Sequence, residues 1–240
     1  MAMLPADLRS AEAQALEALL AALPSQARGR WSVDWRFEGL RLLPPALRLA
    51  AALQEAGQAV RLVFADAGAA ALARRDAPGL AEQIVDFRGQ MRQAAEQGAG
   101  DGGDSEQTPP LLLAVAPSPP DYVDFEQLCA GHAGSVVMLN GSLEDAAVGI
   151  GSVARDRRRG FLSQWQPAYA LQPLEGAALR FAFPGPWELY RQDPDGFRLA
   201  ASFDQRPDLE MQMEALSGEG GAGLAGNLRA LDAFVEGLRN

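Results

Sequence analysis

The sequence predicts an α/β fold: a mainly parallel, Rossmann-like sheet flanked by helices, with antiparallel hairpins and helices in the C-terminal third. Two observations predict it. Short apolar runs alternate with helical patterns up to about residue 166, and aromatic segments separated by turn sequences follow. Strand and helix alternation is typical of parallel sheets, whereas strands joined by tight turns form hairpins. With 240 residues, 48% of them hydrophobic, the chain is long enough for a substantial core.

The first 166 residues supply the parallel part. An amphipathic helix is expected over 5–23, ended by Pro24, and Trp31, Val33 and Trp35 alternate with polar residues as in a half-buried strand. Residues 97–110 collect glycine, aspartate, serine and proline and are expected to form a mobile loop. The other predicted elements are helices at 45–55, 67–75, 122–130 and 155–165, and strands at 60–65, 83–87, 111–116 and 135–139.

The C-terminal third supplies the hairpins. Strands are expected at 169–171, 178–183, 187–190 and 197–203, because Pro-Gly-Pro and Asp-Pro-Asp-Gly turns separate them. A helix follows at 207–216. We therefore expect a single α/β domain over 1–217, a glycine-rich tether over 218–226 and an amphipathic helix within 227–240.

The composition excludes several chemistries. The chain has no lysine, one histidine (His132) and one cysteine (Cys129). Schiff-base chemistry and a Walker-type phosphate lysine are therefore excluded, and Cys129 and His132 alone cannot build a zinc site. We expect no metal and no cofactor, assign no catalytic residue, and interpret Cys129 as a buried cysteine at a helix end.

Charge and local composition also limit the partners and the compartment. The net charge of -10 disfavours nucleic acid. The N-terminus lacks the pattern of a secretion signal and no apolar run is long enough for a transmembrane segment. A lone cysteine gives no internal disulfide, so we expect a soluble, cytoplasmic protein, with peripheral membrane association only through a partner.

Polar residues at predicted strand ends give a candidate ligand pocket. Asp66, Ser118 and Asn140 each follow an apolar strand, and open parallel sheets bind ligands at the carboxyl ends of their strands. The same residues also suit helix caps and turns: Asp66 precedes a helix, and Ser142 with Asp145 resembles a capping box. Both interpretations stay open.

One basic cluster stands out on this acidic chain. Arg155, Arg157, Arg158 and Arg159 lie on a predicted helix, where they suit a phosphate, carboxylates or an acidic partner. The alternative is a solvated face whose arginines pair with nearby acidic residues.

Two further patterns have simple structural explanations. The glycines at 221, 223 and 226 spell a dinucleotide fingerprint, but no strand delivers them and the chain ends soon afterwards, so we interpret them as tether. The aromatic residues of the C-terminal half are expected to pack in the core, unless an exposed subset marks a binding surface. These residues are Trp165, Tyr169, Phe181, Phe183, Trp187 and Tyr190.

Five segments, at 60–76, 140–145, 157–162, 169–174 and 183–190, carry a family resemblance. Through them the chain resembles a domain family of unknown biochemical function from cyanobacteria and chloroplasts, which includes the plant low photosystem II accumulation proteins and a domain appended to a chloroplast adenylate kinase. The resemblance covers most of the chain and brings no established catalytic residues with it. It implies a photosynthetic bacterium and an auxiliary role in assembling or maintaining photosystem II at the thylakoid membrane, with a photosystem subunit as protein partner.

We therefore expect a non-enzymatic interaction protein. The alternative is an enzyme or sensor that binds a nucleotide or phosphorylated metabolite at the strand ends. A third possibility is that the C-terminal helix docks on a second copy, and the sequence leaves the oligomeric state open.

Overall fold

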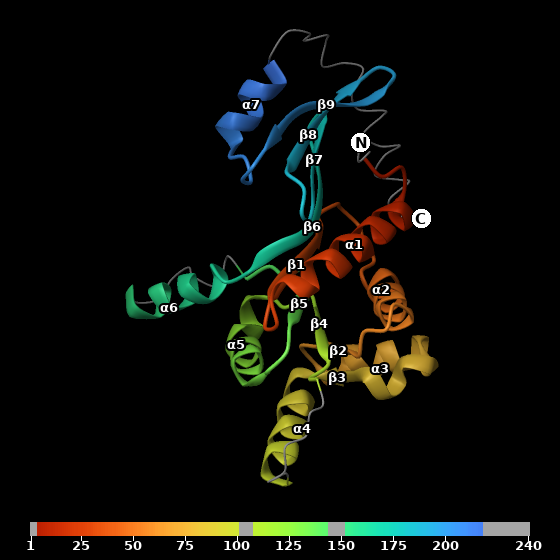
Figure 1. Ribbon diagram of the computed structural model, residues 1–240, viewed down its shortest axis with the longest axis vertical. Coiled ribbons are helices and arrows are strands. Elements are labelled where there is room, and N and C mark those ends of the chain that lie inside the picture. Colours follow the sequence, from red (N-terminus) through yellow and green to blue (C-terminus); the bar gives the residue numbers. More distant parts are fainter. Residues whose placement is uncertain (1–3, 101–107, 144–151, 218–240) are drawn as a thin grey trace. The chain divides into compact units, whose positions relative to one another are not determined.

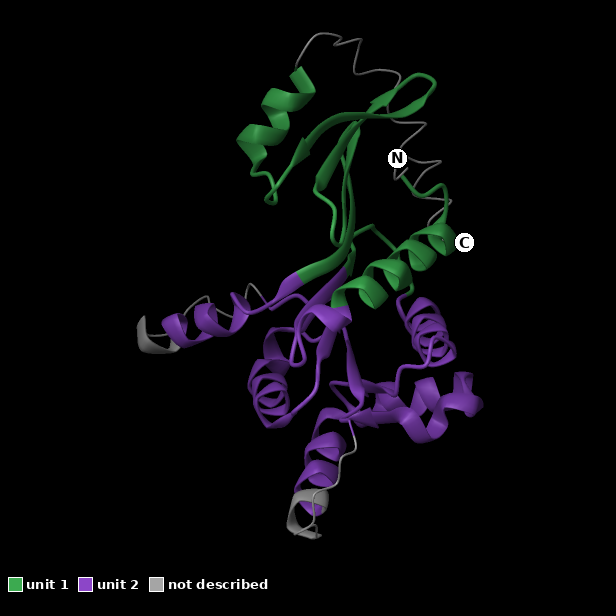
Figure 2. Cartoon of the chain, viewed as in Figure 1, with its two compact units in different colours: residues 1–22, 34–41, 167–240 green, residues 23–33, 42–166 purple. Residues whose placement is uncertain are grey.

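A computed structural model describes residues 4–100, 108–143 and 152–217. The predicted α/β class is confirmed: the strands form one nine-stranded sheet, parallel in its first part and antiparallel in its last, and helices flank it (Figure 1). The chain divides into two compact units, one of residues 1–22, 34–41 and 167–240 and the other of residues 23–33 and 42–166 (Figure 2). The single domain expected over 1–217 stays a prediction, and the expected tether and final helix lie outside the described residues.

Unit 2 (residues 23–33 and 42–166) holds the parallel strands in the order β3-β2-β4-β5-β1. The first strand of the chain therefore pairs with the fifth, with Arg30 opposite Val136. Its strands are β1 (Arg30–Trp35, which continues into unit 1), β2 (Val60–Phe64), β3 (Ile84–Asp86), β4 (Leu111–Val115) and β5 (Val136–Leu139). Its helices are α2 (Leu43–Glu55), α3 (Ala67–Asp76), α4 (Phe87–Gly100), α5 (Tyr122–Gly131) and α6 (Ser152–Leu162).

The helices of unit 2 cover its strands because successive strand residues face opposite sides. Val63, Leu112 and Val136 share a core with α5 and α6, whereas α2 and α3 pack against β2 and β3. Figure 1 shows α5 and α2 on opposite sides of these strands. Five aromatic rings pack together on the α5–α6 side, at centroid separations of 5.4 to 6.0 Å. They belong to Phe125 and its neighbours Phe87, Phe161 and Trp165, with Tyr122 edge-on to Phe161.

Unit 1 (residues 1–22, 34–41 and 167–240) holds the antiparallel strands in the order β6-β7-β8-β9. As expected from the turn sequences, these strands are consecutive hairpins. The elements are α1 (Leu8–Ala22), β6 (Gln166–Leu174), β7 (Ala177–Ala182), β8 (Trp187–Asp193), β9 (Gly196–Phe203) and α7 (Leu209–Ser217). The predicted burial of Tyr169, Phe181, Trp187 and Tyr190 is confirmed, so these aromatics are not a binding surface; Trp165 and Phe183 are partly buried.

Two predicted elements differ from the structure. The chain is helical over α4 up to Gly100, where the composition predicts a loop from residue 97; the first residues of the expected loop are the last turn of this helix, and 101–107 lie outside the described residues. The helix predicted over 155–165 is α6, which begins at Ser152 and ends at Leu162. Composition sets the first expectation and apolar periodicity the second, and the apolar pattern is weak where glutamine and arginine fill a helix.

Candidate functional site

The carboxyl ends of β2, β4 and β5 hold the three predicted pocket residues. The parallel register pairs Phe64 with Val115 and Val115 with Leu139, so Asp66, Ser118 and Asn140 follow at the same edge of the sheet. This shared edge is what the sequence predicts.

Two of these residues act as caps. Asp66 Oδ1 accepts a hydrogen bond from the amide of Ala69 (2.9 Å), which begins α3. The Ser118 amide donates to Asp121 Oδ2 (2.9 Å) at the turn before α5. The proposed box of Ser142 and Asp145 extends beyond the described residues. Capping therefore accounts for Asp66 and Ser118 without any ligand.

The third residue has an unusual backbone. Asn140 has a φ of 50°, and Ala116, which follows the neighbouring strand, has a φ of 48°. The amide of Ala116 donates to Leu139 O (2.8 Å) and that of Asn140 to Val33 O (2.8 Å), so the β-ladder holds both residues in place. Left-handed backbone is tolerated by asparagine but unfavourable for alanine, and it occurs often at functional sites.

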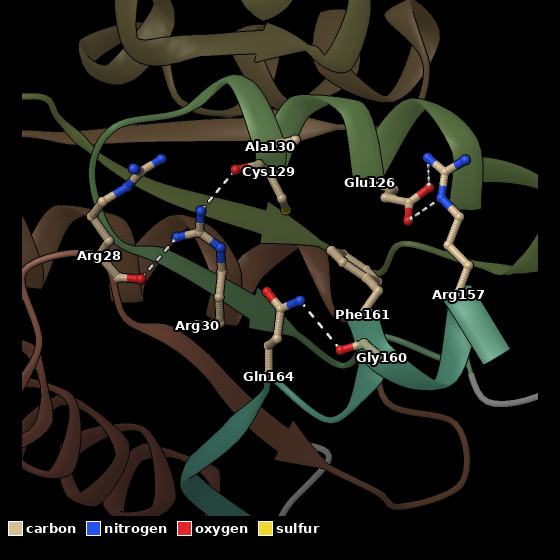
Figure 3. A pocket seen from close by; sticks show the side chains of 9 residues that line it. All are labelled: Arg28, Arg30, Glu126, Cys129, Ala130, Arg157, Gly160, Phe161 and Gln164. Atoms are coloured by element: carbon tan, nitrogen blue, oxygen red, sulfur yellow. Dashed lines mark hydrogen bonds and ion pairs between the residues drawn. The ribbon is translucent and has the colours of Figure 1, made fainter.

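A cavity of about 610 Å³ lies elsewhere in unit 2, near the amino end of β1 (Figure 3). Neither this cavity nor a second one described below is lined by Asp66, Ser118 or Asn140. Residues from the start of β1, from α5 and from α6 surround it. They are Arg28, Arg30, Glu126, Cys129, Ala130, Arg157, Gly160, Phe161 and Gln164.

Arg30 forms the inner wall of this cavity. Its Nη2 donates to Cys129 O (2.7 Å) and its Nη1 to Gly134 O (3.0 Å), at the C-terminal end of α5. Burial lowers the pKa of Arg30 below its ordinary value, with a smaller contribution from Arg28. The guanidinium still carries its charge at neutral pH, because an arginine pKa lies far above it. The guanidinium thus satisfies the Cys129 carbonyl, which α5 leaves open, and the Gly134 carbonyl in the loop after α5.

Arg28 stands at the exposed side of the same wall. Its Nη2 donates to His132 O (3.1 Å), the residue after α5. Within the described part of the chain, neither Arg28 nor Arg30 forms an ion pair with a carboxylate. Two cations therefore meet at the negative end of a helix dipole.

The opposite wall carries an ion pair. Arg157 of α6 contacts both oxygens of Glu126 on α5, at 3.1 Å from Nε and 2.9 Å from Nη2. The next residue, Arg158, lies over the ring of Tyr122 at 4.7 Å from its centroid. Two of the four predicted arginines therefore fasten α6 to α5, which matches the alternative of pairing within the chain. Arg155 and Arg159 remain exposed.

The lone cysteine and the lone histidine are both buried. Burial raises the pKa of Cys129 to about 12, so the thiol is protonated at neutral pH. His132 Nε2 donates to Pro110 O (2.9 Å), and burial lowers the pKa of the imidazole. The expected buried cysteine at a helix end is confirmed.

The second cavity, of about 320 Å³, lies between α4 and α5. Its walls are largely apolar, from Met91, Leu112 and Leu128, with Gln90 and His132 among the polar groups. Gln90 Oε1 accepts a hydrogen bond from Arg61 (3.1 Å), and His132 is committed to Pro110 O. Gln90 and His132 thus already form hydrogen bonds within the unit.

Two searches of the described residues, one for groups of metal ligands and one for membrane-spanning helices, found none. Among the residues with described positions, no three His, Cys, Asp or Glu side chains gather as metal ligands. No helix in the described part of the chain is long and apolar enough to cross a membrane.

Comparison with known families gives one match. The model of a domain of unknown function, DUF1995, matches residues 5–214. The chain belongs to this family. A search of curated proteins found no match. The match covers most of the described residues and names no activity.

Sequence reasoning missed most residues of the larger cavity. Arg28, Arg30 and Gln164 form no recognisable motif, because they are isolated polar residues beside a strand and a helix end. The available signal was two arginines at the start of a buried strand. They lie at the amino end of the strands, whereas ligands of open parallel sheets usually bind at the carboxyl ends.

Proposed function

We propose that the protein acts by binding another protein, without catalysis, and that α6 presents basic residues to an acidic partner. Arg155 and Arg159 carry this proposal. They are four residues apart on α6, which places them on one face, and both are exposed. Within the described residues, the Arg159 guanidinium contacts no carboxylate.

The neighbouring arginines support this assignment by holding the helix. Arg157 pairs with Glu126 and Arg158 covers Tyr122, while Phe161 packs against Phe125 at 6.0 Å. An anchored helix presents its exposed basic residues in a fixed arrangement, which lowers the entropy lost on binding. On a chain of net charge -10, a local basic face would steer an acidic segment toward α6.

The environment of the reactive groups agrees with a non-enzymatic role. A thiol with a pKa near 12 is a poor nucleophile at neutral pH, and His132 holds its proton on Pro110 O. Both groups serve packing and hydrogen bonding.

The biological setting rests on the family resemblance. It supports a role in a photosynthetic bacterium, peripheral at the thylakoid membrane, in photosystem II assembly or maintenance through a photosystem subunit. An exposed acidic loop of such a subunit has the chemistry that Arg155 and Arg159 would recognise.

The test is affinity capture of the tagged full chain from gently solubilised membranes and from soluble extract of its native host. The double variant Arg155→Glu/Arg159→Glu leaves Arg157 and Arg158 in place, and with them their contacts with Glu126 and Tyr122. Arg92→Glu, an exposed change on α4, is the matched control.

We expect photosystem II subunits to be enriched with the native chain and with the control. The double variant should weaken binding of the purified partner by about tenfold, more at low salt than at high salt. Equal recovery with all three chains would contradict the role of α6, and enrichment of unrelated proteins would contradict the photosystem setting.

The alternative proposal is a nucleotide- or phospho-metabolite-binding site at the strand ends. The left-handed Ala116 and Asn140 favour it, because they sit at adjacent ends of β4 and β5. A thermal-shift screen with nucleotides and sugar phosphates tests it, since a ligand at 100 times its dissociation constant adds about 2.7 kcal/mol of stability. A shift that survives Asp66→Ala and Asn140→Gly would place the ligand elsewhere.

A further inference from the structure

The cavity of about 610 Å³ has the size and the charge of a ligand site. It falls in the range of volumes that hold small organic molecules. Three of its lining residues are arginines and one is a glutamate, on a chain whose net charge is -10. A local excess of positive charge in a hollow raises the concentration of small anions there.

The positive charge is concentrated at one end. Figure 3 shows Arg28 and Arg30 together on one side, and Arg157 with Glu126 on the other. Arg157 is neutralised by Glu126, whereas Arg28 and Arg30 contact only backbone carbonyls among the described residues. Carbonyls orient a guanidinium without cancelling its charge. The end formed by Arg28 and Arg30 therefore lacks a counterion.

The guanidinium of Arg30 is held in place, whereas most N–H groups of the Arg28 guanidinium have no partner among the described residues. Hydrogen bonds from both Nη atoms of Arg30 to carbonyl oxygens hold its guanidinium against α5. Arg28 makes a single hydrogen bond with the described residues, out of the five that a guanidinium offers. An incoming anion would meet one rigid cation and one adaptable cation, and the planar fork of arginine suits carboxylate and phosphate.

Between the two ends lies an apolar wall. The Phe161 ring separates the Arg30 side from the Glu126–Arg157 pair (Figure 3). Its edge-on contacts with Tyr122 (5.6 Å) and Trp165 (5.9 Å) fix its orientation. A fixed aromatic surface favours a flat apolar group.

Gly160 has no side chain that could extend into the cavity beside Phe161. A Cβ added at Gly160 would meet no atom within 4 Å, so packing does not require glycine there. Glycine is also unfavourable inside a helix. Gly160 is thus one of three α6 residues that line the cavity, and its missing side chain leaves space for an occupant.

We propose that this cavity binds a small organic anion with a flat apolar body, its anionic group on Arg28 and Arg30 and its body against Phe161. The site differs from the strand-end pocket and does not depend on the docking role of Arg155 and Arg159. Either proposal can therefore fail without the other.

The test is a calorimetric titration of the full chain with 1-naphthyl phosphate and with 1-naphthoate. Inorganic phosphate lacks the apolar body, so it tests the contribution of the anionic group alone. The compound 1-naphthol lacks the charge, so it tests the contribution of the apolar body alone. Arg28→Gln removes the adaptable cation, Gly160→Leu fills the cavity, and Arg92→Gln on α4 is the matched control. Circular dichroism checks that each variant is folded.

We expect at least one naphthyl anion to bind saturably, and more tightly than inorganic phosphate or 1-naphthol. Arg28→Gln should weaken that binding by about tenfold, because a charge-assisted hydrogen bond contributes that much. Gly160→Leu should abolish it and Arg92→Gln should leave it unchanged. The proposal is overturned if neither naphthyl anion binds, or if Arg28→Gln and Gly160→Leu, once folded, bind as the native chain does.

Discussion

The side chain of Asp66 could serve as a helix cap or as part of a binding site, and the cap can be tested through its effect on stability. Its Oδ1 caps α3 through the amide of Ala69. We expect Asp66→Ala to lower the free energy of unfolding by about 1 kcal/mol, the usual cost of losing a cap. Asp76→Ala is the control: this carboxylate ends α3, pairs only with exposed Arg75 in the described part, and should change stability by less than about 0.5 kcal/mol. Urea titration measures both, and equal effects would contradict the capping role.

Arg30 stabilises the end of α5 through backbone carbonyls. Arg30→Met keeps the aliphatic stem but leaves Cys129 O and Gly134 O without their donor. We expect a loss of about 1.5 to 3 kcal/mol of unfolding free energy, because half-buried acceptors lose charge-assisted bonds. Arg92→Met, an exposed change on α4, should cost less than about 0.5 kcal/mol. Chemical denaturation of both variants checks this, and a loss below about 0.5 kcal/mol for Arg30→Met would show that water replaces the guanidinium.

Two glycines, one after a helix and one inside a helix, make a matched comparison at the scale of elements. Gly57 follows α2 with a φ of 86°, whereas Gly160 lies within α6, and an added Cβ would meet nothing within 4 Å at either position. Only backbone conformation distinguishes them. Gly160→Ala should raise the free energy of unfolding by about 0.5 to 1 kcal/mol, and Gly57→Ala should lower it by about 1 kcal/mol.

Thermal unfolding of the two glycine variants, each against the native chain, gives the signs directly. If both variants shift the midpoint in the same direction, the conformational argument fails. A stabilised Gly160→Ala would also show that the glycine is not required for folding, as the cavity proposal assumes.

Periodicity predicts the elements well where one face is apolar. The strand β1 follows from alternation of apolar and polar residues, β2, β4 and β5 follow from apolar runs, and the four hairpin strands follow from their turns. The helix α4 was missed because glutamine, arginine and alanine fill most of it. A local signal was present: Asp86 ends a strand and accepts a hydrogen bond from the Gly89 amide, as Asp66 does for α3. A cap is thus a better indicator of this helix than its apolar pattern.

The order of strands and the larger cavity are properties of the whole fold. The pairing of β1 with β5 brings Arg30 to Cys129, 99 positions along the chain. No periodicity encodes which strands become neighbours, because that choice depends on packing across the sheet. The strand-end residues could be predicted, since a parallel sheet aligns its carboxyl ends, whereas a cavity formed by three distant segments could not.

The stability of the whole molecule should fall at alkaline pH. Burial raises the pKa of Cys129 from an ordinary value of 9.0 to about 12, with Arg30 opposing the shift less strongly. Below pH 9 the thiol is protonated in both the folded and the unfolded state. As the pH rises from 9 toward 12, only the unfolded chain ionises, so the free energy of unfolding falls by up to about 1.4 kcal/mol per pH unit.

Tyrosines add to this loss at higher pH. Burial also raises the pKa values of Tyr122 and Tyr190 from 10.0 to about 12. Between pH 9 and pH 10 the slope therefore belongs mainly to the thiol, and above pH 10 the phenols join it. Cys129→Ala should flatten the lower interval and leave the decline above pH 10. Urea titrations at half-unit steps from about pH 8 to about pH 11 measure both intervals, and an unchanged slope between pH 9 and pH 10 would show that the thiol ionises in the folded protein as it does in the unfolded chain.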